Sequence, residues 1–189
     1  ADWANVFVTN DFSHVVSLSR ASGGIVWEQD AMRMRSLTTP VPYANTIVVG
    51  DFEGYVHFLD GETGAEHFSI PPSEKVSCVA TPAFGDIDND GLPELVTVWN
   101  SPGGVFRLKA FEHDGTVKWT NETDGGAANQ FYRQSGAVAI HDLDADGDPE
   151  IVFNHEVYDK DGFLLWEKVN PQPGELEASV AVDLDGDGM

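Results

Sequence analysis

The chain has 189 residues, of which 41% are hydrophobic and 22% charged, which is typical of a folded globular protein and argues against disorder. Its net charge of −22 and its ten scattered Lys and Arg residues argue against a nucleic-acid partner, because phosphate binding requires clustered basic side chains. A single cysteine, Cys78, excludes an internal disulfide, and no hydrophobic run is long enough to predict a membrane span. No signal peptide is visible, and we expect a piece of a longer protein.

A glycine followed four residues later by a large aromatic residue recurs along the chain. The four pairs are Gly23 with Trp27, Gly64 with Phe68, Gly115 with Trp119, and Gly162 with Trp166. Each glycine follows a short β-branched and aromatic run, so each is expected to close a hairpin. A repeat of about 40 to 50 residues carrying four strands is the signature of a β-propeller blade.

We therefore predict an all-β fold, a β-propeller of four-stranded antiparallel blades with about four blades per chain. Complete blades are expected at about residues 36–70, 76–121 and 135–168. Residues 5–29 supply only three strands of a first blade, which lacks its inner strand, and residues 177–182 supply one isolated strand. Two arrangements follow: a closed four-bladed monomer completed by the C-terminal strand, or a homodimer that completes a ring of about eight blades.

Three segments of the second half place aspartates at alternate positions and end in a glycine. They begin at Asp86, Asp142 and Asp183. Three carboxylates within five residues repel one another, and a Ca²⁺ ion with its six to eight oxygen ligands removes that cost. An acidic residue also follows at the ninth position of the first two copies, as Glu94 and Glu150. A solvated acidic turn without metal is the alternative.

The residues after these loops distinguish them from an EF-hand, which would need a bidentate Glu at position 12 and a following helix. Position 12 holds Thr97 in the first copy and Phe153 in the second. The segments 94–99 and 150–154 are β-branched and aromatic, and therefore predict strands. The expected unit is strand, calcium loop, strand.

The segments 84–96 and 140–152 resemble FG-GAP/VCBS propeller repeats, and this resemblance covers about residues 76–189. It implies a set of calcium ligands, some through side chains and some through the carbonyls of Leu92 and Asp148. The first site would use Asp86, Asp88, Asp90, Leu92 and Glu94, the second Asp142, Asp144, Asp146, Asp148 and Glu150, and the third Asp183, Asp185 and Asp187. The third copy lacks its later ligands, so its occupancy stays open.

Residues 5–70 are different: the segments 37–43 and 47–64 resemble PQQ-like repeats of the BamB type. That family implies eight-bladed rings that bind partners and do not catalyse. Phe68 stands where a quinoprotein dehydrogenase would carry a docking tryptophan, so we expect no PQQ. Two parts follow, residues 1–70 with PQQ-like blades and residues 71–189 with calcium-binding blades, joined in one propeller or half-propeller. A natural hybrid, a trimmed fragment and an engineered splice all fit this pattern.

The sequence predicts a calcium-stabilised binding or structural scaffold outside the cytoplasm, with a protein or glycan partner and no catalytic residues. Loops this acidic bind Ca²⁺ well where the ion is plentiful, which favours the periplasm, the cell surface or secretion. The alternative is a fragment of a calcium-dependent polysaccharide lyase resembling rhamnogalacturonan lyases. For that alternative, Arg107, Lys109 and Arg133 are the candidate uronate-binding residues.

Overall fold

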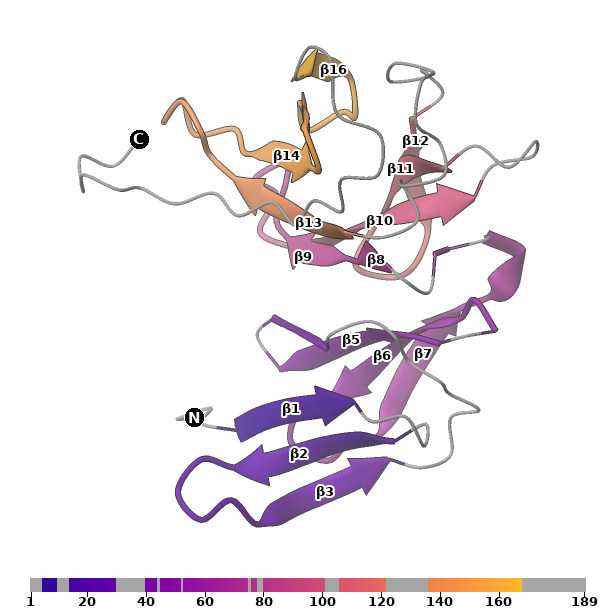
Figure 1. Cartoon of the computed structure of the whole chain (residues 1–189), viewed down its shortest axis with the longest axis vertical. Helices are drawn as coiled ribbons and strands as arrows, with labels where there is room; N and C mark the ends of the chain where they lie inside the picture. Colours follow the sequence, from indigo (N-terminus) through magenta and orange to yellow (C-terminus); the bar gives the residue numbers. More distant parts are fainter. Residues whose placement is uncertain are drawn as a thin grey trace. The chain divides into compact units, whose positions relative to one another are not determined.

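The structure is a computed structural model, and it divides into two compact units, unit 1 (Ala1–Cys78) and unit 2 (Val79–Met189) (Figure 1). The structure describes residues 5–9, 14–29, 40–43, 45–51, 53–74, 76–77, 80–100, 106–121 and 136–167. Over these ranges the chain consists of β-strands and turns, with one short 3₁₀ helix, Pro72–Glu74.

Unit 1 contains two antiparallel sheets whose strands follow one another in chain order. The first blade has three strands, β1 (Asn5–Thr9), β2 (Val15–Ser19) and β3 (Ile25–Gln29). The second blade has four strands, β4 (Val41–Tyr43), β5 (Thr46–Gly50), β6 (Val56–Asp60) and β7 (Glu66–Ile70). Buried apolar side chains of β2, β5 and β6 form one cluster with Trp27 of β3, because alternate residues of each strand face inward.

Unit 2 repeats the same plan with two further sheets. The third blade consists of β9 (Ala83–Gly85), β10 (Glu94–Asn100), β11 (Phe106–Phe111) and β12 (Val117–Thr120). The fourth blade consists of β13 (Gly136–His141), β14 (Glu150–Phe153), β15 (Glu156–Tyr158) and β16 (Leu164–Glu167). A two-residue strand, β8 (Ala80–Thr81), pairs in parallel with β13 and extends the fourth blade to five strands.

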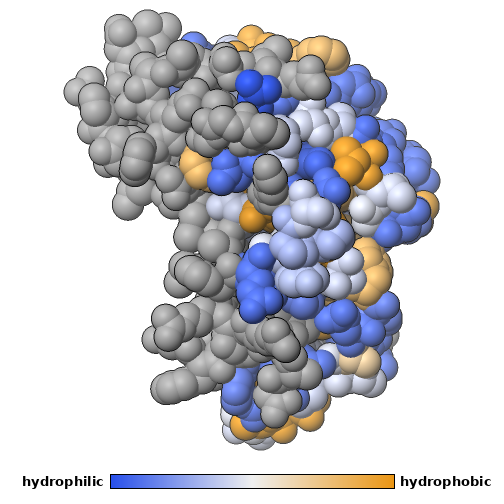
Figure 2. Space-filling view, turned by 90° about the vertical axis from the view of Figure 1, so that its right-hand side faces the viewer, coloured by the Kyte–Doolittle hydropathy of each residue, from blue (hydrophilic) through white to orange (hydrophobic). Residues whose placement is uncertain are grey.

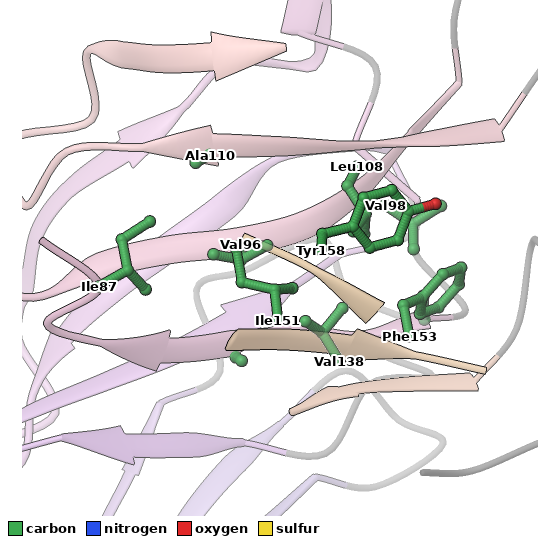
Figure 3. Close-up of a cluster of buried hydrophobic side chains, with 11 residues drawn as sticks. Ile87, Val96, Val98, Leu108, Ala110, Val138, Ile151, Phe153 and Tyr158 are labelled. Atoms are coloured by element: carbon green, nitrogen blue, oxygen red, sulfur yellow. The ribbon is translucent and has the colours of Figure 1, made fainter. Parts of the chain in front are cut away.

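The core of unit 2 lies between its two blades (Figure 3). Val96 and Val98 come from β10, Ile151 and Phe153 from β14, and all four are almost fully buried. Ile87, which belongs to the first acidic segment and not to a strand, is fully buried in the same cluster. The loop that carries the aspartates is therefore anchored to the core by its second residue.

The predicted fold class is confirmed: the chain is all-β and is built from four-stranded antiparallel blades, the first of which has three strands. The four hairpin glycines all adopt a positive φ, between 69° at Gly23 and 85° at Gly115. The isolated strand expected at residues 177–182 lies outside the described residues.

One predicted strand is corrected by the structure. The segment 76–84 is short and apolar, which predicts one strand before the Asp-rich segment that begins at Asp86, yet it divides at Pro82. Proline has no amide hydrogen and cannot continue a ladder. Before it, β8 pairs with β13 of the fourth blade, and after it, β9 pairs with β10 of the third blade. This segment thus links the two blades of unit 2 through backbone hydrogen bonds.

On the face that Figure 2 shows, the described residues present a predominantly hydrophilic surface. On the face in view, hydrophobic side chains form small patches that hydrophilic ones separate. Among the described residues, no helix is long and apolar enough to cross a membrane.

Candidate metal centre

Two acidic loops occupy the same place in the two blades of unit 2. The first acidic loop, residues 86–93, joins β9 to β10, and the second acidic loop, residues 142–149, joins β13 to β14. Their backbones are alike: the fourth and sixth residues have positive φ in both, 62° and 90° at Asn89 and Gly91, and 59° and 95° at Ala145 and Gly147. Two independent sequences thus reach one loop conformation.

In the first acidic loop the backbone turns three carboxylates toward one another. Asp86, Asp88 and Asp90 each offer an oxygen atom within 4.8 Å of the others. Backbone amides hold these side chains: Gly91 donates to Asp86 Oδ2 at 2.9 Å, and Leu92 donates to Asp90 Oδ1 at 2.7 Å. The other oxygen of Asp86, Oδ1, is buried without a hydrogen-bond partner.

Glu94, the first residue of β10, contacts the same loop. Its side chain is fully buried, and its Oε2 accepts a hydrogen bond from the Ile87 amide at 2.9 Å. Its Oε1 is buried and has no partner. Burial raises the pKa of the Glu94 carboxyl to about 7, against the lowering effect of the Ile87 amide. A buried carboxylate oxygen without a partner is costly. The orphaned oxygens of Asp86 and Glu94 therefore fit a bound hard cation.

A lysine of the same blade also contacts the first acidic loop. Lys118 Nζ, on β12, lies 2.6 Å from Asp88 Oδ2 and 2.9 Å from Glu112 Oε1. The hydrogen bond from Lys118 lowers the pKa of Asp88. Burial opposes the charge on Lys118, but the hydrogen bonds to Asp88 and Glu112 outweigh it and raise the pKa of the amine. The loop thus already holds one positive charge at its outer side.

The second acidic loop reproduces these contacts. Gly147 donates to Asp142 Oδ2 at 3.0 Å, and Leu143 donates to Glu150 Oε2 at 2.8 Å. Asp142 Oδ1 is buried without a partner, as is its counterpart in the first loop. Burial raises the pKa of Glu150, which is 9% exposed. The side-chain oxygens of Asp142, Asp144 and Asp146 again lie within 4.8 Å of one another.

The two acidic loops touch. Asn89 Nδ2 donates to the Gly147 carbonyl at 2.7 Å and lies 3.4 Å from Asp148 Oδ1. Asp148 in turn accepts a hydrogen bond from Lys160 Nζ at 2.7 Å. The two candidate sites are therefore neighbours on one edge of unit 2.

The structure brings together the three expected aspartates of each of the first two loops. Glu94 and Glu150 contact the same loops through the amides of Ile87 and Leu143. Leu92 and Asp148, expected to contribute carbonyls, lie within the loops, and Leu92 is 43% exposed. The expected third site, Asp183, Asp185 and Asp187, lies outside the described residues, as does Arg133.

Sequence reasoning missed several contacts. Lys118, Lys160 and Asn89 reach the loops from positions that only the folded blades define. It also missed a cluster of His155, Glu156 and Glu167, whose potential ligand atoms lie within 4.8 Å of one another because β15 pairs with β16. Glu156 is buried and accepts a hydrogen bond from the Tyr158 hydroxyl at 2.6 Å, which gives it a structural role.

Comparison with known proteins identifies one matching family. Its description is "Outer membrane protein assembly factor BamB", and the match runs over residues 11–187. It therefore extends through the acidic loops and well beyond residue 70.

Individual relatives match shorter stretches. The outer membrane protein assembly factor BamB of Shewanella oneidensis is 41% identical over 61 residues, which is 32% of this chain and 15% of that protein. The same factor of Taylorella asinigenitalis is 36% identical over 100 residues, 51% of this chain and 23% of that protein. The matched stretches thus cover less than a quarter of these relatives.

Solved structures share the fold. The crystal structure of BamB from Moraxella catarrhalis superposes with a TM-score of 0.52 at 19% identity, over 89% of this chain and 50% of that one. A quinohemoprotein alcohol dehydrogenase from Pseudomonas putida superposes with a TM-score of 0.58 at 18% identity, over 89% of this chain and 34% of that one.

Proposed function

The chain belongs to the family of the outer membrane protein assembly factor BamB, and on that premise we propose that it is a propeller scaffold that binds proteins during outer membrane assembly. The observation that carries this proposal is the family match over residues 11–187, together with the Shewanella and Taylorella relatives that bear that description. On the same premise we propose that the chain works outside the cytoplasm, in the periplasm of a cell with an outer membrane.

The blades suit a binding role because they present rigid hairpins on stable sheets. The turns at Gly64 and Gly162 are each fixed by a tryptophan of the preceding blade, so the loops between strands start from fixed positions. Binding residues commonly lie on loops that a rigid scaffold positions. The proposed partner is accordingly a protein, and the contact surface lies on the blade edges.

We further propose that the acidic loops bind Ca²⁺ as in FG-GAP/VCBS repeats, with one ion in each of the first two. Asp86, Asp88, Asp90 and Glu94 would hold the first ion, and the corresponding residues of the second loop the other. The ion would supply charge neutralisation and fix the loop; it has no part in a reaction. The support is the pair of buried, unpartnered oxygens, Asp86 Oδ1 and Glu94 Oε1, and the repetition of the geometry at Asp142.

The acidic loops would then be calcium-dependent connections within blades of the BamB type. The parts 1–70 and 71–189 would then differ in how one edge of each blade is stabilised, and not in the blade itself. No PQQ is proposed, because Phe68 stands at the strand position where β3, β12 and β16 carry tryptophan.

A competition experiment tests the scaffold function. The purified chain is immobilised and exposed to detergent-solubilised outer membranes of Shewanella oneidensis, beside immobilised BamB of that organism. We expect both to retain the same outer membrane protein, and free Shewanella BamB to displace it from this chain. If the two baits share no retained protein, the assembly function is wrong. Incubation with rhamnogalacturonan provides the second arm, where a rise in unsaturated uronate absorbance would favour a lyase.

A further inference from the structure

A lysine engages the middle aspartate of the first acidic loop. Lys118 Nζ lies 2.6 Å from Asp88 Oδ2, and the side chain of the lysine is only 17% exposed. The other oxygen, Asp88 Oδ1, accepts a hydrogen bond from the Asp90 amide at 3.2 Å. Both oxygens of Asp88 therefore accept hydrogen bonds within the blade, and one of these bonds comes from a full positive charge.

The middle aspartate of the second acidic loop, Asp144, has a different neighbour on the outer strand. Its Oδ1 accepts from the Asp146 amide at 3.2 Å, as in the first loop. The outer strand of the fourth blade, however, carries Leu165 at the position of Lys118, and this side chain is 52% exposed. A leucine cannot donate a hydrogen bond to a carboxylate.

The pairing of the strands establishes that Lys118 and Leu165 are equivalent. Each directly precedes the tryptophan of its outer strand, Trp119 in β12 and Trp166 in β16. Both outer strands pair antiparallel with the strand before them, and in both pairs the register shifts at the same place. The two acidic loops thus share one backbone but differ in the charge that the outer strand presents to them.

The fourth blade does place a lysine at its acidic loop, but elsewhere. Lys160 Nζ lies 2.7 Å from Asp148 Oδ2, and the Asp148 side chain is 51% exposed. Asp148 is not one of the three aspartates whose oxygens come together. An exposed ion pair of this kind contributes little. Lys160 therefore does not replace Lys118 as a partner of the middle aspartate.

The position of Lys118 affects how strongly the first loop can bind a cation. The affinity of an acidic loop for Ca²⁺ depends on the number of charged ligands. Lys118 offsets the charge of Asp88 and repels any dication that shares this carboxylate. Its ammonium also lies 2.9 Å from Glu112 Oε1, so it keeps a carboxylate partner when Asp88 turns to an ion. The competition is therefore reversible.

We propose that Lys118 competes with Ca²⁺ for Asp88, which makes the first acidic loop the low-affinity site and the second acidic loop the high-affinity site. This inference rests on the proposed binding of Ca²⁺ to the two loops and adds the order in which they fill. As free Ca²⁺ rises, the second loop fills first, and the first loop fills when the ion is concentrated enough to displace the ammonium. Unit 2 thus responds to calcium in two steps.

Titration of the isotope-labelled chain with Ca²⁺, followed by NMR, measures each loop separately. The amides of Gly91 and Gly147 serve as reporters, because they donate to Asp86 in the first loop and to Asp142 in the second. We expect the Gly147 signal to reach its midpoint at a free Ca²⁺ concentration about tenfold or more below that of Gly91. Calorimetry of the same titration should show two classes of site.

A reciprocal exchange of the two outer-strand residues is the sharpest test. Lys118→Leu gives the first loop the neighbour of the second, and should tighten Ca²⁺ binding at the Gly91 reporter by about tenfold. Leu165→Lys places an ammonium at the equivalent position of the fourth blade, and should weaken binding at the Gly147 reporter by about tenfold. Leu165 is exposed, so the fold tolerates the new side chain.

Two control variants separate the contact with Asp88 from net charge. Lys160→Leu changes the net charge by the same amount as Lys118→Leu, but it removes a lysine that contacts Asp148. It should change binding at either reporter by less than about threefold. Lys118→Arg keeps a positive donor beside Asp88 and should retain the weak first site, again within about threefold.

The outcomes distinguish this inference from the calcium proposal itself. If neither reporter responds to Ca²⁺ in any variant, both are wrong. If both loops bind with equal affinity and the exchange of Lys118 and Leu165 changes neither, calcium binding stands and the competition is wrong. Equal effects of Lys118→Leu and Lys160→Leu would also overturn it, because net charge would then be the cause. A first loop that binds Ca²⁺ only after Lys118→Leu would support the competition in its strongest form.

Discussion

The second blade and the two blades of unit 2 solve the same connection in different ways. In the second blade, β4 ends at Tyr43 and β5 begins at Thr46, so a tight turn joins them. Asn45 fixes this turn by donating to Asp60 Oδ2 at 3.0 Å and by accepting from the Gly61 amide at 2.8 Å. In unit 2 the same connection is an acidic loop, with β9 ending at Gly85 and β10 beginning at Glu94.

The second blade and the blades of unit 2 differ in this connection, but consecutive blades contact one another in the same way in both units. Both units dock a tryptophan on the following hairpin, so the contact between consecutive blades does not depend on the connection. The tight turn leaves one neutral amide oxygen, Asn45 Oδ1, buried without a partner, whereas the acidic loops leave three carboxylate oxygens in that state, Asp86 Oδ1, Glu94 Oε1 and Asp142 Oδ1. Unit 2 should therefore depend on a cation for part of its stability, and unit 1 should not.

Removal of calcium should produce the largest effect and should be confined to unit 2. With free Ca²⁺ about 100-fold above each dissociation constant, linkage stabilises the folded loops by about 2.7 kcal/mol per site, or about 5 kcal/mol for two. For a unit of this size each kcal/mol changes Tm by roughly 4–8 °C. Hydrogen exchange with and without chelator should show that the amides of β9–β16 lose protection, whereas those of β1–β7 keep theirs.

Magnesium at equal concentration is the control for that experiment, because its smaller octahedral shell fits a loop of this kind poorly. If chelation leaves the protection of unit 2 unchanged, the calcium assignment is wrong. A loss of protection in both units would show that the distinction between the tight turn and the acidic loops is wrong.

The effect of Glu94→Gln on the free energy of unfolding should depend on calcium. This dependence makes the variant a sharper probe of the difference between the two units. In calcium the variant loses a charged ligand and should be destabilised by about 2–3 kcal/mol, the linkage of one site. In chelator it should be no less stable than the unchanged protein, because a neutral amide is cheaper to bury than a carboxylate. Denaturant unfolding under both conditions measures the two free energies.

Glu150→Gln is the matched substitution in the second acidic loop. Glu150 is 9% exposed, whereas Glu94 is fully buried, so the stability gained by the substitution in chelator should be smaller. A Glu94→Gln variant that is equally destabilised with and without calcium would mean that the carboxylate serves the fold through the Ile87 amide alone.

The hairpin glycines test what the two units have in common. Gly64→Ala and Gly162→Ala should each cost about 2–3 kcal/mol, since the new methyl combines backbone strain with overlap of an indole. Gly23→Ala has a similar φ but open space, so it should cost only the strain, about 1–2 kcal/mol. Denaturant unfolding of the three variants measures the difference. Equal costs at the three positions would contradict the docking.

Much of the fold could be predicted because its signals are local. The hairpin glycines, the β-branched runs and the Asp-rich loops each specify their own conformation, and the three aspartates of each of the first two loops lie close together. The pairing of β8 with β13 of the fourth blade could not be predicted. Pro82 indicates that a strand ends there, but it does not indicate which strand β8 pairs with. Lys118 and Asn89 were missed for the same reason: their partners lie 30 and 58 residues away, respectively.

The smallest expected effect concerns the contact between the two acidic loops. The described residues of unit 1 have no equivalent contact. Asn89→Gly keeps the positive φ but removes the bond to the Gly147 carbonyl, and should cost about 1 kcal/mol. Because that bond joins the two loops, the variant should also bind two calcium ions with less cooperativity in calorimetric titration. Ala145→Gly, at the equivalent position with a φ of 59°, is the control and should be neutral or slightly stabilising. If Asn89→Gly retains the cooperativity of the unchanged protein, the Asn89 contact does not couple the two loops and serves packing alone.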